Sequence, residues 1–355
     1  MNVYDPLAQD YHARAGRRLV PPRVQEGDSV AIVSPGFGAV GRWPHRAERG
    51  IAYLEGLGLR VKVMENARRS EGWASAPPEV RVADLHAAFL DDEVAVVLAG
   101  IGGNHANQLL PLLDFDLIAA HPNVFQGFSD MTVLHWAFLR HAGLGGFYWP
   151  MLCTALGEFP AIHPESDRSL RAAWFGAEPL RYEPAAAWTD EFLDWEQKLD
   201  LTRARELHPG EGWVALRGGR AEGWLLGGCL ETICWHLKGS ASWVEPDGAI
   251  LFLETSEEAP SPAEVDAYLT DLEQLGVFDR AAAFVVARAC GYDTEQTKQL
   301  YEVVVARTEA SRIPVLANVD IGHTDQILTL PIGSRALVDV DARRFETLEP
   351  ATADA

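Results

Sequence analysis

The sequence is poor in cysteine and in basic side chains, and it lacks any long apolar run. Only four of its 355 residues are cysteines, and no two of them form a Cys-x-x-Cys pair. This scarcity favours a reducing compartment, and the spacing excludes a zinc ribbon. No stretch reaches the roughly 18 consecutive apolar residues that a membrane span needs. The first residues also lack the apolar core of a signal peptide, which favours the cytoplasm.

Acidic side chains outnumber basic ones by a wide margin. Lys and Arg number 30, Asp and Glu number 51, and the formal net charge is −21. A surface of this sign repels phosphate backbones and anionic membranes, so neither nucleic acid nor a membrane is expected as a partner. The remaining composition, 48% hydrophobic and 23% charged, is typical of a folded globular chain. The length suggests about two domains.

The first part of the chain alternates apolar runs with segments of helical periodicity. After a polar N-terminal arm, residues 1–20, the alternation fills a first domain over 21–160. Strand alternating with helix predicts an α/β fold with a parallel sheet covered on both faces. The apolar runs predict strands over 30–35, 59–64, 94–99 and 123–128, and the periodic segments predict helices over 43–57, 77–90 and 130–141.

Residues 161–220 differ in character and are predicted to be a connecting region. They contain prolines, short acidic patches and Trp174, Trp188, Trp195 and Trp213. Connections of this length are usually functional or disordered, and four tryptophans argue against disorder. The alternation resumes in a second domain over 221–355. Its predicted helices are 228–238, 261–275 and 294–309, and its predicted strands are 249–254, 283–287, 314–317 and 332–340.

Residues 36–41 match the Gly-x-Gly-x-x-Gly pattern of dinucleotide-binding proteins. That pattern needs a helix that begins within the glycines, because the helix N-terminus holds the pyrophosphate. Here Pro44 would fall inside the helix and remove a hydrogen bond. The nearest acidic residue after the second strand, Glu65, also comes late. A dinucleotide-dependent oxidoreductase remains an alternative that titration with NAD(P) would test.

Ser129 lies where the predicted strand 123–128 turns into a helix. Such a turn exposes the hydroxyl at the carboxyl edge of the sheet, as in the nucleophile elbows of hydrolases. The helix N-terminus would place free backbone N–H groups beside it, where they can stabilise an oxyanion. The segment reads Gly-Phe-Ser-Asp-Met, which departs from Gly-x-Ser-x-Gly. A serine that only caps the helix is the alternative reading of this segment.

A serine nucleophile needs a base, and the second domain offers His323 and Glu254. His323 follows the predicted strand 314–317 and the turn-forming Gly322. Glu254 ends the apolar strand 249–254, where a half-buried carboxylate needs a partner and can orient an imidazole. The alternatives are a surface histidine and a solvent-exposed carboxylate at a strand end.

Several motifs in order along the chain resemble the LD-carboxypeptidase family of serine peptidases. The resemblance covers nearly the whole sequence and is more specific than any single motif. The segments that carry it are GDSVAIVSP at 27–35, IGGNHANQLLPLLDFD at 101–116, NVFQGFSDMTVL at 123–134, LLGGCLET at 225–232, ILFLE at 250–254 and PVLANVDIGHTDQILTLPIG at 314–333.

The resemblance implies a flavodoxin-like N-terminal domain, with a parallel sheet, and a smaller swivelling β/α C-terminal domain. It maps the family triad onto Ser129, Glu254 and His323. Backbone N–H groups of Gly103 and Asp130 are the implied oxyanion donors. It implies hydrolysis of an amide through an acyl-enzyme, with no metal and no cofactor, by a cytoplasmic homodimer.

The long separation between Ser129 and Glu254 looks like the branch that contains the microcin C self-immunity peptidases, which cleave an amide next to a nucleotide-like moiety. The substrate is expected to be a small aminoacyl- or peptidyl-nucleotide or an L,D-muropeptide. The implied substrate contacts are Gly102, Asn104, His105, Trp188 and Trp195, although these tryptophans could equally anchor the connecting region. Departures from the family pattern at His105, Ala106 and Cys229 affect the substrate contacts and leave the triad intact. A catalytically silent binding protein with the same fold is a further alternative.

Overall fold

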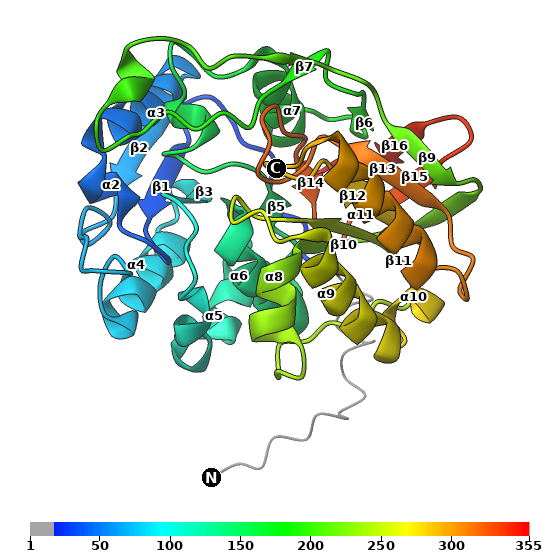
Figure 1. Ribbon diagram of the computed structural model, residues 1–355. Coiled ribbons are helices and arrows are strands. Elements are labelled where there is room, and N and C mark those ends of the chain that lie inside the picture. Colours follow the sequence, from blue (N-terminus) through cyan, green and yellow to red (C-terminus); the bar gives the residue numbers. More distant parts are fainter. Residues whose placement is uncertain (1–17, 355) are drawn as a thin grey trace.

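The structure, a computed structural model, describes residues 18–354. The predicted N-terminal arm, residues 1–20, therefore lies outside the described residues apart from its last three. The described chain forms two α/β halves that lie side by side, each built on its own sheet (Figure 1). All four cysteines are buried and free. Within residues 18–354, no helix combines the length and the apolar character that a bilayer crossing requires.

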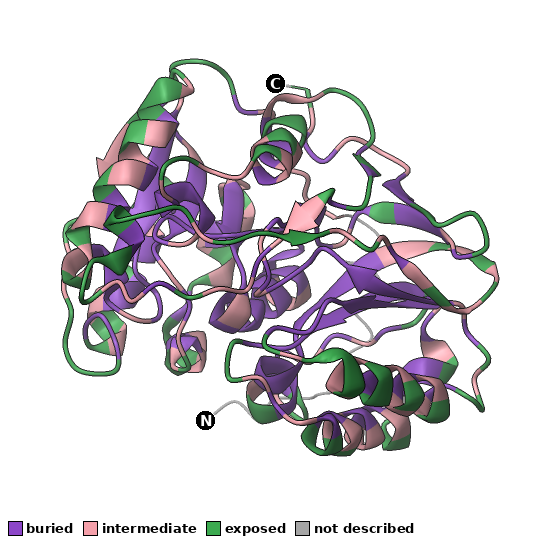
Figure 2. Cartoon of the chain, turned by 45° about the horizontal axis from the view of Figure 1, so that its top comes forward, coloured by how far each residue is buried: buried purple, intermediate pink, exposed green. Residues whose placement is uncertain are grey.

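The first sheet has the strand order β14-β5-β4-β3-β1-β2. β1 to β5 run parallel to their neighbours, whereas β14, which comes from the far end of the chain, pairs antiparallel with β5. The central strands are buried because helices cover both faces of the sheet, which explains their unbroken apolar sequence (Figure 2). The strands are β1 (Ser29–Val33), β2 (Arg60–Val63), β3 (Val94–Ala99), β4 (Val124–Gly127), β5 (Phe147–Tyr148) and β14 (Leu330–Pro331).

The helices of this half confirm the predicted alternation. Pro44 occupies the first position of α3, where its missing N–H costs nothing, so the helix begins at the proline and does not run through it. The predicted helix 130–141 consists of a 3-10 turn over Ser129–Met131, α6 and a π-turn over Phe138–Ala142 that ends at Gly143. The helices are α2 (Ala39–Arg42), α3 (Pro44–Gly56), α4 (Pro78–Leu90), α5 (Phe115–Ala120), α6 (Thr132–Ala137) and α7 (Pro164–Phe175).

The second sheet has the order β6-β16-β15-β10-β11-β12-β13-β9. Its centre, β10 to β13, is parallel and its flanking strands are antiparallel. The strands are β6 (Arg181–Tyr182), β9 (Val214–Arg217), β10 (Arg220–Cys229), β11 (Ala249–Glu254), β12 (Ala283–Ala287), β13 (Val315–Val319), β15 (Arg335–Asp339) and β16 (Arg344–Thr347). The helices are α8 (Leu230–Thr232) with a π-turn over Ile233–Leu237, α9 (Pro262–Gln274), α10 (Val277–Arg280) and α11 (Thr294–Arg307).

The connecting region, residues 161–220, holds more regular structure than the sequence indicates. It contains α7, the two edge strands β6 and β9 of the second sheet, and a small ribbon formed by β7 (Ala187–Trp188) and β8 (His208–Pro209). Strands of two residues are too short to show a period of two, so the sequence gives no signal for them. Between α7 and β9 the region runs along the top of both halves (Figure 1).

Hydrogen bonds between side chains of α6 and the backbone at the end of β10 join the two halves. The indole of Trp136 donates a hydrogen bond to the Gly227 carbonyl at 2.9 Å, and the Cys229 N–H donates to Thr132 Oγ1 at 3.1 Å. Gly228 has a φ of +141°, and a Cβ there would lie 2.5 Å from the Thr132 side chain. Gly228 therefore lets β10 of one half pack directly on the helix that follows Ser129 in the other.

Candidate functional site

Ser129 stands on a sharp turn directly after β4. Its φ is +61°, in the left-handed region that residues other than glycine rarely adopt. The Ser129 N–H donates to the hydroxyl oxygen of Tyr148 at 3.1 Å, which helps to hold this conformation. At Gly127, a Cβ would lie 2.6 Å from Met131 Cγ, so the glycine lets the turn close tightly. Strain of this kind is a feature of functional turns that project a side chain out of a sheet.

A second loop, 101–106, follows β3 and lies against the Ser129 turn. A Cβ on Gly102 would be 3.0 Å from Ser129 Cβ and 3.4 Å from the Asp130 nitrogen, so a larger residue here would crowd the serine turn. The carboxylate of Asp130 accepts hydrogen bonds from the His105 and Ala106 N–H groups, both at 3.0 Å. Burial raises the pKa of Asp130 to about 6, against the lowering effect of these backbone donors. Asp130 thus fixes the loop beside the serine with its side chain.

Glu254 and His323 meet at the carboxyl ends of β11 and β13. Glu254 is only 2% exposed, and its Oε2 lies 2.7 Å from His323 Nδ1. Tyr148 donates its hydroxyl to the other oxygen of Glu254. A Cβ on Gly322, which has a φ of +85°, would fall 2.3 Å from Glu254 Oε2. The glycine before the histidine therefore makes room for the carboxylate, whose burial is tolerated because both oxygens are paired.

The other ring nitrogen of His323 also faces a carboxylate. Its Nε2 lies 2.9 Å from Oε2 of Glu257, three residues beyond β11. Burial lowers the pKa of His323, but the charges and hydrogen bonds of Glu254 and Glu257 outweigh it and hold this pKa well above its usual value. Partial desolvation at the cavity raises the pKa of Glu257, but the hydrogen bond and the charge of His323 outweigh this effect and lower the pKa to about 2.

Ser129 and His323 line one cavity of about 570 Å³. Gly102 and Gly103 line it as well, which brings together residues from both halves of the chain. The cavity has an aromatic wall, which we define as Phe37, Trp43, Phe192 and Trp195.

The aromatic wall is held together by ring contacts. The ring centroids of Trp43 and Trp195 are 5.1 Å apart in an edge-to-face arrangement, and the guanidinium of Arg46 lies 4.1 Å from the Trp195 ring. Phe192 is 68% exposed, so a flat apolar surface remains open at this wall.

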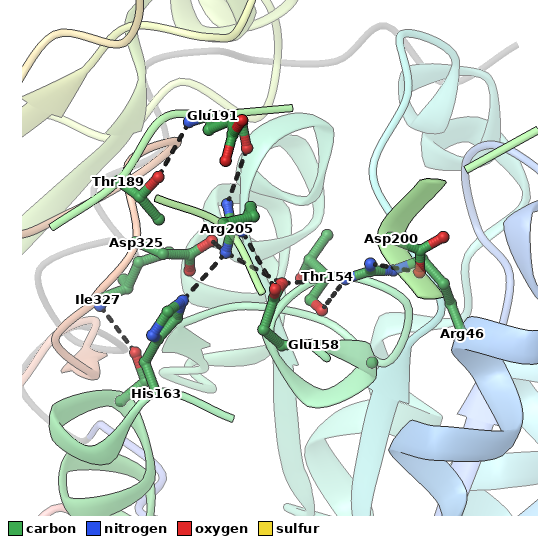
Figure 3. Close-up of polar contacts among 12 residues, drawn as sticks. Arg46, Thr154, Glu158, His163, Thr189, Glu191, Asp200, Arg205, Asp325 and Ile327 are labelled. Carbon is green, nitrogen blue, oxygen red and sulfur yellow. Dashed lines mark hydrogen bonds and ion pairs between the residues drawn. The ribbon is translucent and has the colours of Figure 1, made fainter. Parts of the chain in front are cut away.

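Opposite charges line another part of the cavity (Figure 3). Arg205 lies between Asp325, at 2.5 Å, and Glu158, at 3.0 Å. Arg46 pairs with Asp200 at 3.1 Å. Both guanidiniums are therefore neutralised by buried carboxylates, which lets them lie in the protein interior.

Not all the residues predicted as substrate contacts lie at the cavity. Gly102 and Trp195 line it, whereas Asn104, His105 and Trp188 are absent from its described lining. Asn104 is exposed to solvent, and the His105 ring lies 6.3 Å from Trp73. Trp188, on β7, packs against the guanidinium of Arg288, which directly follows β12 of the second sheet, at 4.7 Å.

The two remaining tryptophans of the connecting region anchor it. Trp174 donates its indole N–H to Gln126 at 2.8 Å, and Trp213 donates to Asp320 at 3.0 Å, both in buried surroundings.

The sequence did not predict three features of the site: Tyr148, Glu257 and the role of the Asp130 side chain. Of these, only Asp130 could have been found from the sequence, because it directly follows Ser129.

The glycines at 36–41 serve close packing. A Cβ on Gly36 would lie 2.2 Å from the Gly102 carbonyl oxygen, and one on Gly41 would lie 2.0 Å from the Arg68 carbonyl oxygen. The helix that follows, α2, has only four residues and ends before Pro44. The glycine loop 36–41 therefore supports the 101–106 loop, and it is not followed directly by the long helix that a pyrophosphate site needs.

Among the described residues, no cluster of three or more His, Cys, Asp or Glu side chains is placed to hold a metal ion.

The fold and the cavity define an α/β protein with a serine on a strained turn and a buried histidine–glutamate pair. The models of the LD-carboxypeptidase N-terminal and C-terminal domains match residues 30–149 and 222–338. The chain belongs to the LD-carboxypeptidase family and is a hydrolase, a serine-type carboxypeptidase. This finding overturns the dinucleotide-dependent oxidoreductase alternative.

Named relatives match over almost the full length. The putative carboxypeptidase YocD of Bacillus subtilis is 31% identical over 320 residues, which are 89% of this chain and 95% of that protein. The microcin C7 self-immunity protein MccF of Escherichia coli is 28% identical over 331 residues, 91% of this chain and 94% of that one. The structure of MccF in complex with glutamyl sulfamoyl guanosine superposes with a TM-score of 0.87 at 26% identity, covering 94% of this chain and 100% of that chain.

Proposed function

We propose that Ser129, His323 and Glu254 form the catalytic triad of this peptidase. The observation that carries the proposal is the Glu254–His323 pair, 2.7 Å apart, whose imidazole lines the same cavity as Ser129. A carboxylate on Nδ1 fixes the tautomer in which Nε2 accepts a proton. Tyr148 adds support, because its hydroxyl contacts both the Ser129 N–H and Glu254 and so ties the two halves of the triad together.

In the proposed reaction His323 Nε2 takes the hydroxyl proton as Ser129 Oγ attacks the amide carbonyl. Glu254 stabilises the imidazolium that forms. The backbone N–H groups of Gly103 and Asp130 stabilise the oxyanion, supported by the close packing of loop 101–106 on the serine turn. His323 then gives the proton to the leaving group, and water hydrolyses the acyl-enzyme.

The substrate we favour is an aminoacyl or peptidyl group joined to a nucleotide-like moiety. The aromatic wall supports this, because a base can stack on an exposed ring regardless of its identity. Solved relatives include MccF in complex with aspartyl sulfamoyl adenosine. A muropeptide with an L,D amide is the second candidate, since a relative from Bacillus subtilis is named a probable murein peptide carboxypeptidase.

The test compares hydrolysis of an aminoacyl-sulfamoyl adenosine and of an L,D-tetrapeptide by the parent, Ser129→Ala and Ser311→Ala. Ser311 is a matched control outside the described cavity lining, where its hydroxyl bonds to Thr308. We expect the parent and Ser311→Ala to cleave the nucleotide conjugate, and Ser129→Ala to lose at least about 10³-fold in kcat. Retained activity in Ser129→Ala overturns the triad, and cleavage of the tetrapeptide alone selects the second substrate.

The proposal extends to the oligomeric state, the cellular compartment and the domain boundaries of the chain. We propose a cytoplasmic homodimer, in line with the free cysteines, with domains over 21–160 and 221–355 and a connecting region over 161–220. Light scattering of the full chain tests the dimer, and limited proteolysis tests the boundaries. A monomeric mass at micromolar concentration contradicts the assembly.

A further inference from the structure

His323 is held by two carboxylates of unlike character. Glu254 is fully buried and is fixed by Tyr148, whereas the side chain of Glu257 is 70% exposed and sits on the loop between β11 and α9. The contact of Glu257 is with Nε2, the nitrogen that has to receive the proton of Ser129. While this contact lasts, both ring nitrogens donate hydrogen bonds and the imidazole is a cation. In this structure, Nε2 of His323 therefore carries a proton and is not available to accept the proton of Ser129.

The charges near His323 are mostly acidic. Besides its two partners, Asp190 from the connecting region and Asp325 from its own loop line the cavity, and Cys290 stays neutral because burial raises the pKa of its thiol to about 12. The neighbouring aromatic groups, Phe128 and Tyr148, carry no charge at neutral pH.

The cationic side chains that line the cavity are already paired. Within the described lining these are Arg46 and Arg205, which pair with Asp200, Glu158 and Asp325. Glu257, in contrast, has its ion pair with His323. Because its partner is the His323 imidazole, this exposed carboxylate can exchange that contact for a positive charge that a substrate brings close to the scissile carbonyl.

We propose that Glu257 is a specificity-determining residue that binds the free α-ammonium group of the substrate's acyl half and, in doing so, leaves His323 Nε2. The inference rests on the proposed function and narrows it to aminoacyl conjugates with a free amine. The α-nitrogen is two bonds from the carbonyl carbon that Ser129 attacks, so its ammonium enters the cavity that Ser129, Glu257 and His323 line together. In a peptidyl group this nitrogen is an uncharged amide and offers no such partner.

Binding of the ammonium group causes His323 to release its Nε2 proton, for an electrostatic reason. A bound ammonium neutralises Glu257 and adds a positive charge beside the imidazolium, which lowers the pKa of His323. The imidazolium releases its Nε2 proton to solvent. The neutral nitrogen then accepts the proton of Ser129 as Oγ attacks the carbonyl.

The experiment compares leucyl-sulfamoyl adenosine with its N-acetyl derivative on the parent, Glu257→Gln and Glu258→Gln. Glu258 is the exposed neighbour without a contact to His323 and serves as the matched control. We expect the parent to prefer the free amine by about 10-fold or more in kcat/KM, because a charge-assisted contact is lost with the acetyl group. Glu258→Gln keeps this preference and Glu257→Gln loses it.

The pH profile gives a second readout. Removing the Glu257 charge should move the acid limb of kcat/KM to lower pH by about 1 to 3 pH units. An unchanged preference together with an unchanged limb in Glu257→Gln overturns the inference, as does a parent that favours the acetylated substrate. If the parent cleaves neither compound, the proposed substrate class fails while the inference remains testable.

In that case the His323 ring is titrated by NMR with leucinamide or N-acetyl-leucinamide present. Leucinamide alone should lower its titration midpoint in the parent and should not do so in Glu257→Gln. Equal midpoints with both compounds overturn the inference.

Discussion

Two sides of the cavity differ in what surrounds the reacting group. At the end of β4, the hydroxyl-bearing Ser129 is surrounded by close backbone contacts. At the ends of β11 and β13, the imidazole of His323 is in contact with carboxylates. On the first side, Gly102 and Ser129 are so close that a single methyl group would disturb them. On the second side, two glutamates set the charge of His323. Both sides have close steric contacts, but only on the histidine side do carboxylates set the charge of the reacting group, so the two sides should respond differently to substitution.

Loss of the buried carboxylate should have the largest effect. Glu254→Gln keeps the shape of the side chain but lets His323 adopt the wrong tautomer, and we expect kcat to fall by about 10³- to 10⁴-fold. Steady-state kinetics on the substrate that the parent cleaves measure it, with Glu258→Gln as the control. A variant that keeps more than a tenth of the parental kcat (about 1.4 kcal/mol of barrier) contradicts the electrostatic account of this side.

A steric change on the same side separates shape from charge. Gly322→Ala places a methyl group against Glu254 Oε2 without removing any charge, and we expect kcat/KM to fall by about 100-fold because the pair is displaced. Gly239→Ala is the control, since Gly239 has a similar positive φ of +74° and open space around it. It should lose about 1–2 kcal/mol of stability in urea unfolding and no activity. Equal activity in both variants shows that the fit around Glu254 is loose.

On the serine side, the carboxylate of Asp130 can be weakened without a steric change. Asp130→Asn removes the charge from the group that accepts the hydrogen bonds of the His105 and Ala106 N–H groups and buries an amide NH₂ where Oδ1 has no partner, at a cost of about 1–3 kcal/mol. We expect kcat to fall about 10- to 100-fold with little change in KM, because loop 101–106 supports the reacting carbonyl. Asp114→Asn removes a carboxylate that caps α5 and should leave kcat intact. A change in KM alone contradicts a role in the reaction step.

The aromatic wall should show the smallest effect, and it should appear in binding. Trp195→Ala removes a ring that lines the cavity, and we expect KM for a nucleotide conjugate to rise about 10-fold, as for the loss of one stacking contact. Trp188→Ala removes a ring that packs on Arg288 and should leave KM unchanged. If the two variants exchange these effects, the base lies against the β7 segment.

Long, regular elements were predictable from the sequence, and contacts between distant segments were not. The predicted strands 94–99, 249–254 and 283–287 coincide with β3, β11 and β12, because unbroken apolar runs have few alternative structures. The two-residue strands β6, β7 and β8 escaped prediction because their pairing depends on partners far along the chain.

For the site, too, local sequence patterns were predictable and contacts between distant residues were not. The strand-to-helix turn made Ser129 a candidate nucleophile with a helix cap as the alternative, and the resemblance between ordered motifs assigned the triad roles to Ser129, Glu254 and His323. Tyr148 and Glu257 had no signal, because their contacts with Ser129 and His323 join residues that only the fold brings together.

Locating the acyl group on the protein shows directly whether Ser129 forms the acyl-enzyme. The parent is mixed with an aminoacyl-sulfamoyl adenosine, quenched in acid within the first turnover and mapped by peptide mass spectrometry. We expect an aminoacyl adduct on Ser129 that is absent in Ser129→Ala. An adduct on another residue, or turnover by Ser129→Ala at the parental rate, would contradict it.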